Sequence, residues 1–237
     1  MKSKQKKLVL FDIDGTLIAG DHPVARKSVE FALKTVFGLE KVTIDWKGHY
    51  GGTDRGIMTA IAQKHGQDKK ISFKKIKQLA QARFEYFSTN MTPDYGQRIL
   101  PGAKKIIRIL SEKKHIILGV LTGNFEKVGK HKLKLMGIDH YFKFGIFGDL
   151  AKDRNELARN VFRLSKKKLN ADFKPEQIII IGDTPRDIKC AKAINAKVIG
   201  VTTGSYSEKD LLGADLIVNN LNDKRVLKLI LQQKLVV

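Results

Sequence analysis

Two aspartates one residue apart, Asp12 and Asp14, directly follow the apolar run 8–11 and precede a Gly-Thr break. Side chains at positions i and i+2 of a strand share one face, so both carboxylates can serve one site. One can attack an electrophile or hold a metal, while the other, partly protonated beside its neighbour's charge, can transfer a proton. An isolated Asp-x-Asp is usually a solvated loop, so this interpretation depends on the rest of the chain.

A second polar group follows the apolar run 116–121. Thr122 supplies a hydroxyl, Gly123 a backbone amide, and Asn124 completes the segment. A hydroxyl and a glycine amide at a strand end can bind phosphate oxygens. Thr-Gly-Asn is also an ordinary turn, so the phosphate interpretation requires that the aspartates lie nearby.

A third group begins where the run 178–181 ends, with Asp183 at its end and Asp187 four residues later at a predicted helix start. Asp183 can complete an oxygen-rich Mg²⁺ site, which carboxylates suit. Asp187 either orients the metal or a water on it, or is a first-turn acid favoured by the helix dipole. We favour the first role.

Two cations, Lys152 and Arg154, precede another helical pattern. A cation at that position could neutralise a phosphoryl group beside the aspartates. The residue types alone do not separate the two candidates, because the chain is rich in both.

These residues need a framework that brings their strand ends together. Short apolar segments alternate with helical patterns, and continuous apolar strands indicate a parallel sheet covered on both faces. We therefore predict an α/β fold with a doubly wound parallel sheet. The predicted strands are 8–11, 116–121, 144–147, 178–181, 197–201 and 216–218, with helices at 103–111, 155–164 and 185–194.

The interval after the first strand breaks this alternation with three helix-like stretches, 25–37, 53–64 and 73–87. We predict a core of residues 1–16 and 96–237 and an inserted α-helical cap of residues 17–95 over the sheet edge.

Within this cap, Gly51 to Arg55 is the segment most expected to face the site, with Arg55 contacting an anionic substrate. The alternative for this segment is a helix start capped by Thr53 or Asp54.

Composition limits the function classes. The 237 residues carry a net charge of +21, but the basic residues are dispersed and no nucleic-acid-binding motif accompanies them, so we favour a solvated surface over a nucleic-acid partner. No segment is long and apolar enough to span a membrane. The single Cys190 and the lack of a signal-peptide pattern favour a cytoplasmic protein.

Taken in order, these groups resemble the motifs of the haloacid dehalogenase superfamily over nearly the whole chain. Asp12-Ile13-Asp14-Gly15-Thr16 matches the first motif, Thr122 the second, and Gly182 to Asp187 the fourth. The helical insertion is similar to the cap of the phosphoglycolate phosphatase and β-phosphoglucomutase branch.

Two positions depart from the pattern. The third motif lacks the common Lys-Pro, so Arg154 is the first choice for its cation and Lys152 the reserve. Asn195 stands where relatives usually have glycine, but asparagine tolerates the left-handed conformation that such a position requires.

The resemblance implies a Mg²⁺-dependent phosphatase acting on a small phosphorylated metabolite. Asp12 would attack phosphorus to form an aspartyl-phosphate, and Asp14 would protonate the leaving oxygen and then activate water. The metal would be held by Asp12, the Asp14 backbone carbonyl and Asp183, with Asp187 orienting it. The phosphoryl oxygens would bind Thr122, Gly123, Asn124 and Arg154.

Two other functions remain open. A sugar phosphomutase of the β-phosphoglucomutase type shares every core residue, whereas a basic nucleic-acid-binding protein on an inactive form of the fold would explain the charge. A true dehalogenase is disfavoured because that branch lacks the acid found here at Asp14.

Overall fold

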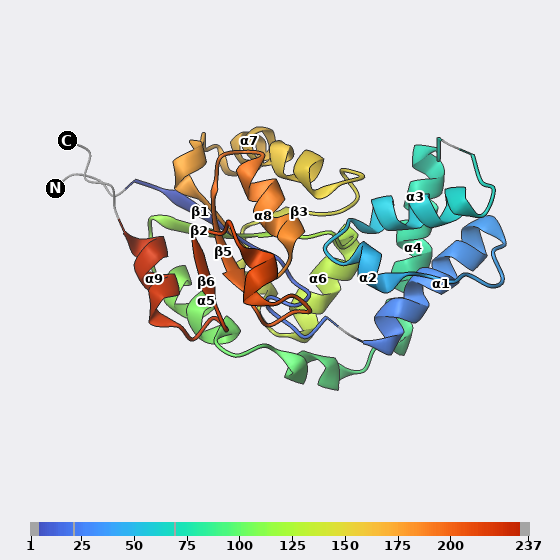
Figure 1. The fold of residues 1–237 in the computed structure, drawn as a ribbon, viewed down its shortest axis with the longest axis horizontal. Coiled ribbons are helices and arrows are strands. Elements are labelled where there is room, and N and C mark those ends of the chain that lie inside the picture. The colour runs from blue at the N-terminus through green and yellow to red at the C-terminus, as the bar shows by residue number, and fades with distance from the viewer. Residues whose placement is uncertain (1–4, 21, 69, 233–237) are drawn as a thin grey trace.

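Six parallel strands form one sheet in the order β3-β2-β1-β4-β5-β6 in a computed structural model that describes residues 5–20, 22–68 and 70–232 (Figure 1). The doubly wound α/β fold predicted from the sequence is confirmed. The strands are β1 (Lys7–Phe11), β2 (Ile116–Leu121), β3 (Phe144–Ile146), β4 (Ile178–Gly182), β5 (Lys197–Val201) and β6 (Leu216–Val218). Each differs from its predicted range by at most one residue at an end.

The two faces of the sheet follow from side-chain alternation along the strands. In β1, Val9 and Phe11 belong to one buried cluster, and Leu8 and Leu10 belong to another. The first cluster includes residues of α5 (Ala103–Ser111), α6 (Glu126–Leu135) and α9 (Lys224–Leu231), and the second includes residues of α7 (Arg154–Leu169) and α8 (Pro185–Lys192). Both faces are therefore covered, as a continuously apolar strand requires.

Four helices between β1 and α5 form a lobe of their own at the right of Figure 1. They are α1 (Pro23–Phe37), α2 (Trp46–His49), α3 (Asp54–Lys64) and α4 (Phe73–Asn90), and a 3₁₀ segment, Pro93–Arg98, leads back toward α5. We call these four helices and their connections the cap helices. The domain boundaries at residues 17 and 95 stay a prediction.

The cap helices and one face of the sheet share a single hydrophobic cluster. Leu33 of α1, Met58 of α3 and Phe87 of α4 are fully buried in the same cluster as Phe11 of β1. This continuity fixes the cap helices beside the strand ends that carry the polar motifs.

Several elements were not predicted, including α2, α6 and α9. Asn195 adopts the left-handed conformation expected of it, with φ of 54°. Among the described residues, no helix is long and apolar enough to cross a membrane.

Candidate active site

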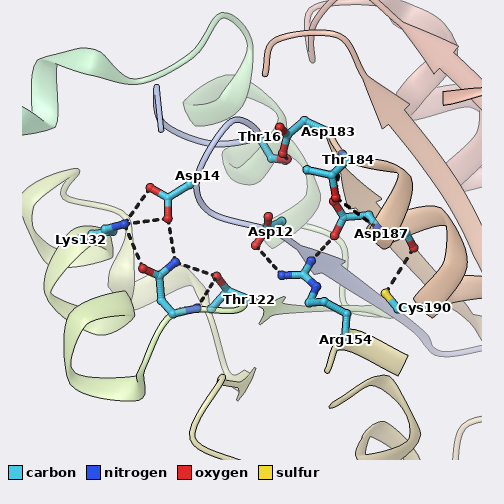
Figure 2. A network of polar contacts seen from close by, with 11 residues as sticks. Asp12, Asp14, Thr16, Thr122, Lys132, Arg154, Asp183, Thr184, Asp187 and Cys190 are labelled. Atoms are coloured by element: carbon cyan, nitrogen blue, oxygen red, sulfur yellow. Dashed lines mark hydrogen bonds and ion pairs between the residues drawn. The ribbon is translucent and has the colours of Figure 1, made fainter. Parts of the chain in front are cut away.

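Neighbouring strand ends bring the predicted site residues together. In the parallel register, Phe11 of β1 lies between its partners in β2 and β4, and the Asp12 amide donates to the Ile181 carbonyl at 2.9 Å. The residues that follow these three strands therefore lie at one edge of the sheet (Figure 2). They are Asp12, Thr122 and Asp183.

A buried arginine connects two of the acids. Arg154, the first residue of α7, lies 3.2 Å from Asp12 Oδ1 through Nη1 and pairs with Asp187 Oδ1 through Nη2. Burial opposes the arginine's charge, but the two carboxylates outweigh it and raise its pKa. Arg154 is thus the cation placed against Asp12, whereas Lys152 is exposed and directs only its backbone amide to Glu156.

Asp12, Asp183 and Asp187 form a compact acidic group. Each offers a carboxylate oxygen within 4.8 Å of the others, and all three side chains are buried. Burial raises the pKa of Asp12 to about 6, with Arg154 opposing the shift and Asp187 and Asp14 adding to it. Burial and repulsion by Asp187 and Asp12 likewise raise the pKa of Asp183. The group is therefore short of positive charge.

The turn after β1 is shaped to admit Asp183. Gly15 has a φ of +78°, and a Cβ there would overlap the Asp183 carboxylate. Thr16 Oγ1 then donates to Asp183 Oδ1 at 3.1 Å. Glycine is needed here for both its left-handed conformation and its lack of a side chain.

Asp187 both caps a helix and faces the acidic group. Its Oδ2 accepts hydrogen bonds from the Thr184 amide at 3.0 Å and hydroxyl at 2.7 Å, which forms a capping box at the start of α8. Its Oδ1 pairs with Arg154 and faces the acidic group. One oxygen thus fixes the helix start and the other faces the site.

Asp14 lies in a separate network. Lys132 Nζ lies 2.7 and 2.6 Å from the two carboxylate oxygens of Asp14, and Asn124 Nδ2 donates to Asp14 Oδ2 at 2.7 Å. Asn124 Nδ2 also donates to Thr122 Oγ1 at 2.9 Å. The amide group of Asn124, which is predicted to bind phosphate, donates to Thr122 and Asp14.

Sequence reasoning missed Lys132, which is 1% exposed. Burial lowers its pKa, although Asp14 opposes that shift. One signal could have identified it, because Lys132 lies four residues after Val128 and directly before Leu133 on the buried face of α6. A lysine at an apolar helix position requires a buried partner.

The cap helices cover these groups and leave a cavity of about 340 Å³. The Asp54 amide donates to the Gly123 carbonyl at 2.7 Å, and the Phe125 amide donates to Asp54 Oδ2 at 2.6 Å. A Cβ at Gly123 would overlap the Gly52 carbonyl, so glycine permits this close approach. The cavity lining includes Asp12, Asp14, Thr122, Asn124, Lys132, Arg154 and Asp183 from the core and Arg26, Trp46, His49, Tyr50, Gly51, Gly52, Asp54 and Arg83 from the cap helices.

The segment from Gly51 to Arg55 both lines the cavity, through its glycines, and starts a helix, through Thr53. Its glycines line the cavity, and Thr53 caps α3 by accepting from the Gly56 amide at 3.0 Å. Arg55 does not line the cavity and instead donates to the Asp149 carbonyl at 3.3 Å. The predicted contact between Arg55 and substrate thus finds no support in the structure, because the first turn of α3 points the side chain elsewhere.

Comparison with known proteins agrees with this geometry. A model of the haloacid dehalogenase-like hydrolases matches residues 6–195. The chain belongs to that family. It is 29% identical over 205 residues to a phosphoglycolate phosphatase of Haemophilus influenzae, covering 84% of this chain and 87% of that protein.

Solved structures of the family share its fold. A β-phosphoglucomutase of Clostridium difficile superposes with a TM-score of 0.68 at 19% identity, over 94% of this chain and 96% of that one. A structure described as a predicted phosphoglycolate phosphatase of Haemophilus somnus gives a TM-score of 0.64 at 23% identity, over 94% and 97%. At these identities the likeness establishes the haloacid dehalogenase-like fold alone.

Proposed function

We propose that this protein is a Mg²⁺-dependent phosphatase that hydrolyses a small phosphomonoester through an aspartyl-phosphate on Asp12. The observation that carries the proposal is the position of Asp12, which lies beside Arg154 and the acidic group on the wall of the capped cavity. The phosphoglycolate phosphatases among its relatives favour phosphoglycolate or a similar small ester as substrate.

In the first half of the reaction, an Asp12 carboxylate oxygen attacks phosphorus, and the bond between phosphorus and the ester oxygen breaks. Asp14 gives a proton to that oxygen, so the product leaves as an alcohol. Arg154 and the Thr122 hydroxyl hold phosphoryl oxygens and offset the charge that develops there. The Gly123 amide adds a neutral donor at the same strand end.

In the second half, Asp14 takes a proton from water, and the water oxygen attacks phosphorus. The bond from phosphorus to Asp12 breaks, which releases inorganic phosphate, restores the Asp12 carboxylate and leaves Asp14 protonated as at the start. The cap helices reduce access of bulk water to this step. Asp14 suits both proton transfers because its side chain is 29% exposed, whereas that of Asp12 is buried.

The acidic group fits a divalent cation. Three buried carboxylates lie together, and burial, with repulsion from the neighbouring carboxylates, raises the pKa values of Asp12 and Asp183. Hard oxygen donors of this kind suit Mg²⁺. The ion would be held by Asp12, Asp183 and the Asp14 backbone carbonyl, and Asp187 would orient it. When bound, Mg²⁺ supplies positive charge that offsets the repulsion between carboxylate and phosphate.

The substrate we infer is a small metabolite and not a nucleic acid, because the acids lie in a cavity roofed by the cap helices. We retain the cytoplasm as the proposed location, since the single cysteine, Cys190, cannot form an internal disulfide.

The proposal is tested by a screen of phosphomonoesters with inorganic phosphate as the readout. We expect release that requires Mg²⁺ and is lost in Asp12→Asn, with Lys130→Met as a matched surface control that keeps full activity. Release by Asp12→Asn at the rate of the parent protein would contradict the proposal. Isomerisation of a hexose phosphate without release would assign the phosphomutase reaction instead.

A further inference from the structure

Lys132 uses its whole donor capacity on two neighbours. An ammonium group has three N–H donors and no acceptor. Three acceptors surround Lys132 Nζ: Asp14 Oδ1 at 2.7 Å, Asp14 Oδ2 at 2.6 Å and Asn124 Oδ1 at 2.9 Å. The ammonium is therefore fully occupied by Asp14 and Asn124, so it is a poor candidate for a direct phosphate ligand.

The same network fixes the orientation of the Asp14 carboxylate. Both of its oxygens are held by Lys132, and Oδ2 is also held by Asn124. A carboxylate held at both oxygens cannot rotate without breaking a charge-assisted hydrogen bond. Because Asn124 also bonds to Thr122, the orientation of Asp14 is tied to the strand end expected to bind phosphate.

Lys132 contacts both the core, through its own helix α6, and the cap helices, through Phe87. Its backbone lies in α6, which begins directly after the Thr122 to Phe125 segment, and its Nζ lies 5.6 Å from the centre of the Phe87 ring on α4. Phe87 is fully buried, and Arg83 one turn earlier on α4 pairs with Asp54. The cap helices thus contact the lysine through the Phe87 ring.

We propose that Lys132 is a positioning residue for proton transfer by Asp14, held in place by Phe87 of the cap helices. This inference rests on the proposed phosphatase reaction. Proton transfer requires a donor within hydrogen-bond reach and correct alignment of the ester oxygen, and small misplacements lower its rate. Lys132 acts through Asp14 and contacts neither phosphorus nor the leaving oxygen.

Two aryl esters of similar size separate this role from a structural one. Phenyl phosphate needs a proton on its leaving oxygen, whereas the nitro group of p-nitrophenyl phosphate stabilises the departing oxygen without one. In Lys132→Met, we expect kcat/KM to fall about 100-fold for phenyl phosphate and less than about tenfold for p-nitrophenyl phosphate. We expect the KM to change less than about threefold, because the phosphate ligands remain.

Two further proteins complete the test. Asp14→Asn removes the group through which Lys132 acts, so adding Lys132→Met to it is expected to cause little further loss with phenyl phosphate. Lys130→Met is the matched control: Lys130 lies on the same helix, is 64% exposed and pairs with Glu126, so both esters should be hydrolysed as by the parent protein.

Equal losses with both esters, or full additivity with Asp14→Asn, would overturn the positioning role. If Lys132→Met does not fold, Lys132→Arg takes its place: the guanidinium keeps the charge but displaces the donors, and the loss must again be larger for phenyl phosphate. The proposed function fails separately, and with it this inference, if Asp12→Asn hydrolyses p-nitrophenyl phosphate at the parent rate.

Discussion

The two motif aspartates have opposite surroundings although one residue separates them. Asp12 is buried with Asp183, Asp187 and the guanidinium of Arg154, whereas Asp14 is partly exposed and held by Lys132 and by a neutral amide. The three carboxylates around Asp12 share the single cation Arg154, while Asp14 has the cation Lys132 to itself. A single turn can thus supply one acid suited to a metal and a covalent bond and another suited to proton transfer.

The largest effect is expected from removing the cation on the Asp12 side. Arg154→Met leaves Asp12 and Asp187 buried without their partner, so we expect the free energy of unfolding, measured in urea, to fall by about 3 kcal/mol or more. We expect the rate of phosphate release to fall about 10³-fold. Arg154→Lys should retain part of the stability and part of the activity. Lys152→Met is the control and should match the parent protein; a large loss there instead would transfer the third-motif role to Lys152.

Next in size is the pH dependence of stability without metal. Because burial raises the pKa of Asp12 to about 6, the folded state binds this proton more tightly than the unfolded state does. Without Mg²⁺, we expect the Tm to fall as the pH rises from about 4 to about 6. Added Mg²⁺ should raise the Tm, and more so at the upper end of that range, where the carboxylate is ionised. Asp12→Asn should flatten the dependence; an unchanged profile in that variant would show that other groups cause it.

A smaller stability loss is expected on the Asp14 side. Lys132→Met removes a buried charge, and the partly exposed Asp14 keeps Asn124 and contact with water. We expect a cost of about 1–2 kcal/mol in urea unfolding, less than for Arg154→Met. A loss of stability equal to that of Arg154→Met would show that the networks around Asp12 and Asp14 support the fold equally, and would contradict the difference in stability that we expect between them.

The smallest effect is expected at Arg55. Its guanidinium bonds to the Asp149 carbonyl and lies outside the cavity lining, so Arg55→Ala should change kcat/KM by less than about twofold and stability by less than about 1 kcal/mol. A large rise in KM with unchanged kcat would restore Arg55 as a substrate contact.

The sequence was sufficient for the parts of the site that sit next to strands. Continuous apolar runs such as 178–181 identify buried parallel strands, and the polar residues that follow them must gather at one sheet edge. Asp12, Thr122 and Asp183 were predicted to lie together for that reason, and Arg154 was preferred on its resemblance to the third motif.

The parts that come from helices were not predictable in the same way. Lys132 belongs to a helix with few apolar residues, in a chain with 45 lysines and arginines, so its spacing from Val128 is the one local signal that separates it from a solvated lysine. The direction of the Arg55 side chain was not predictable for a related reason. The glycines before it permit several chain directions, and only packing against the core decides which way the first turn of α3 faces.

The assignment of the covalent bond to Asp12 is tested most directly by trapping the intermediate. Asp14→Asn slows the water step, so mixing this variant with p-nitrophenyl phosphate and Mg²⁺, followed by acid quenching and peptide mass spectrometry, should reveal a phosphoryl group on Asp12. The same modification should be absent when Asp12→Asn is added. Hydrolysis with no phosphorylated peptide, or a phosphoryl group on another residue, would contradict the division of labour between Asp12 and Asp14.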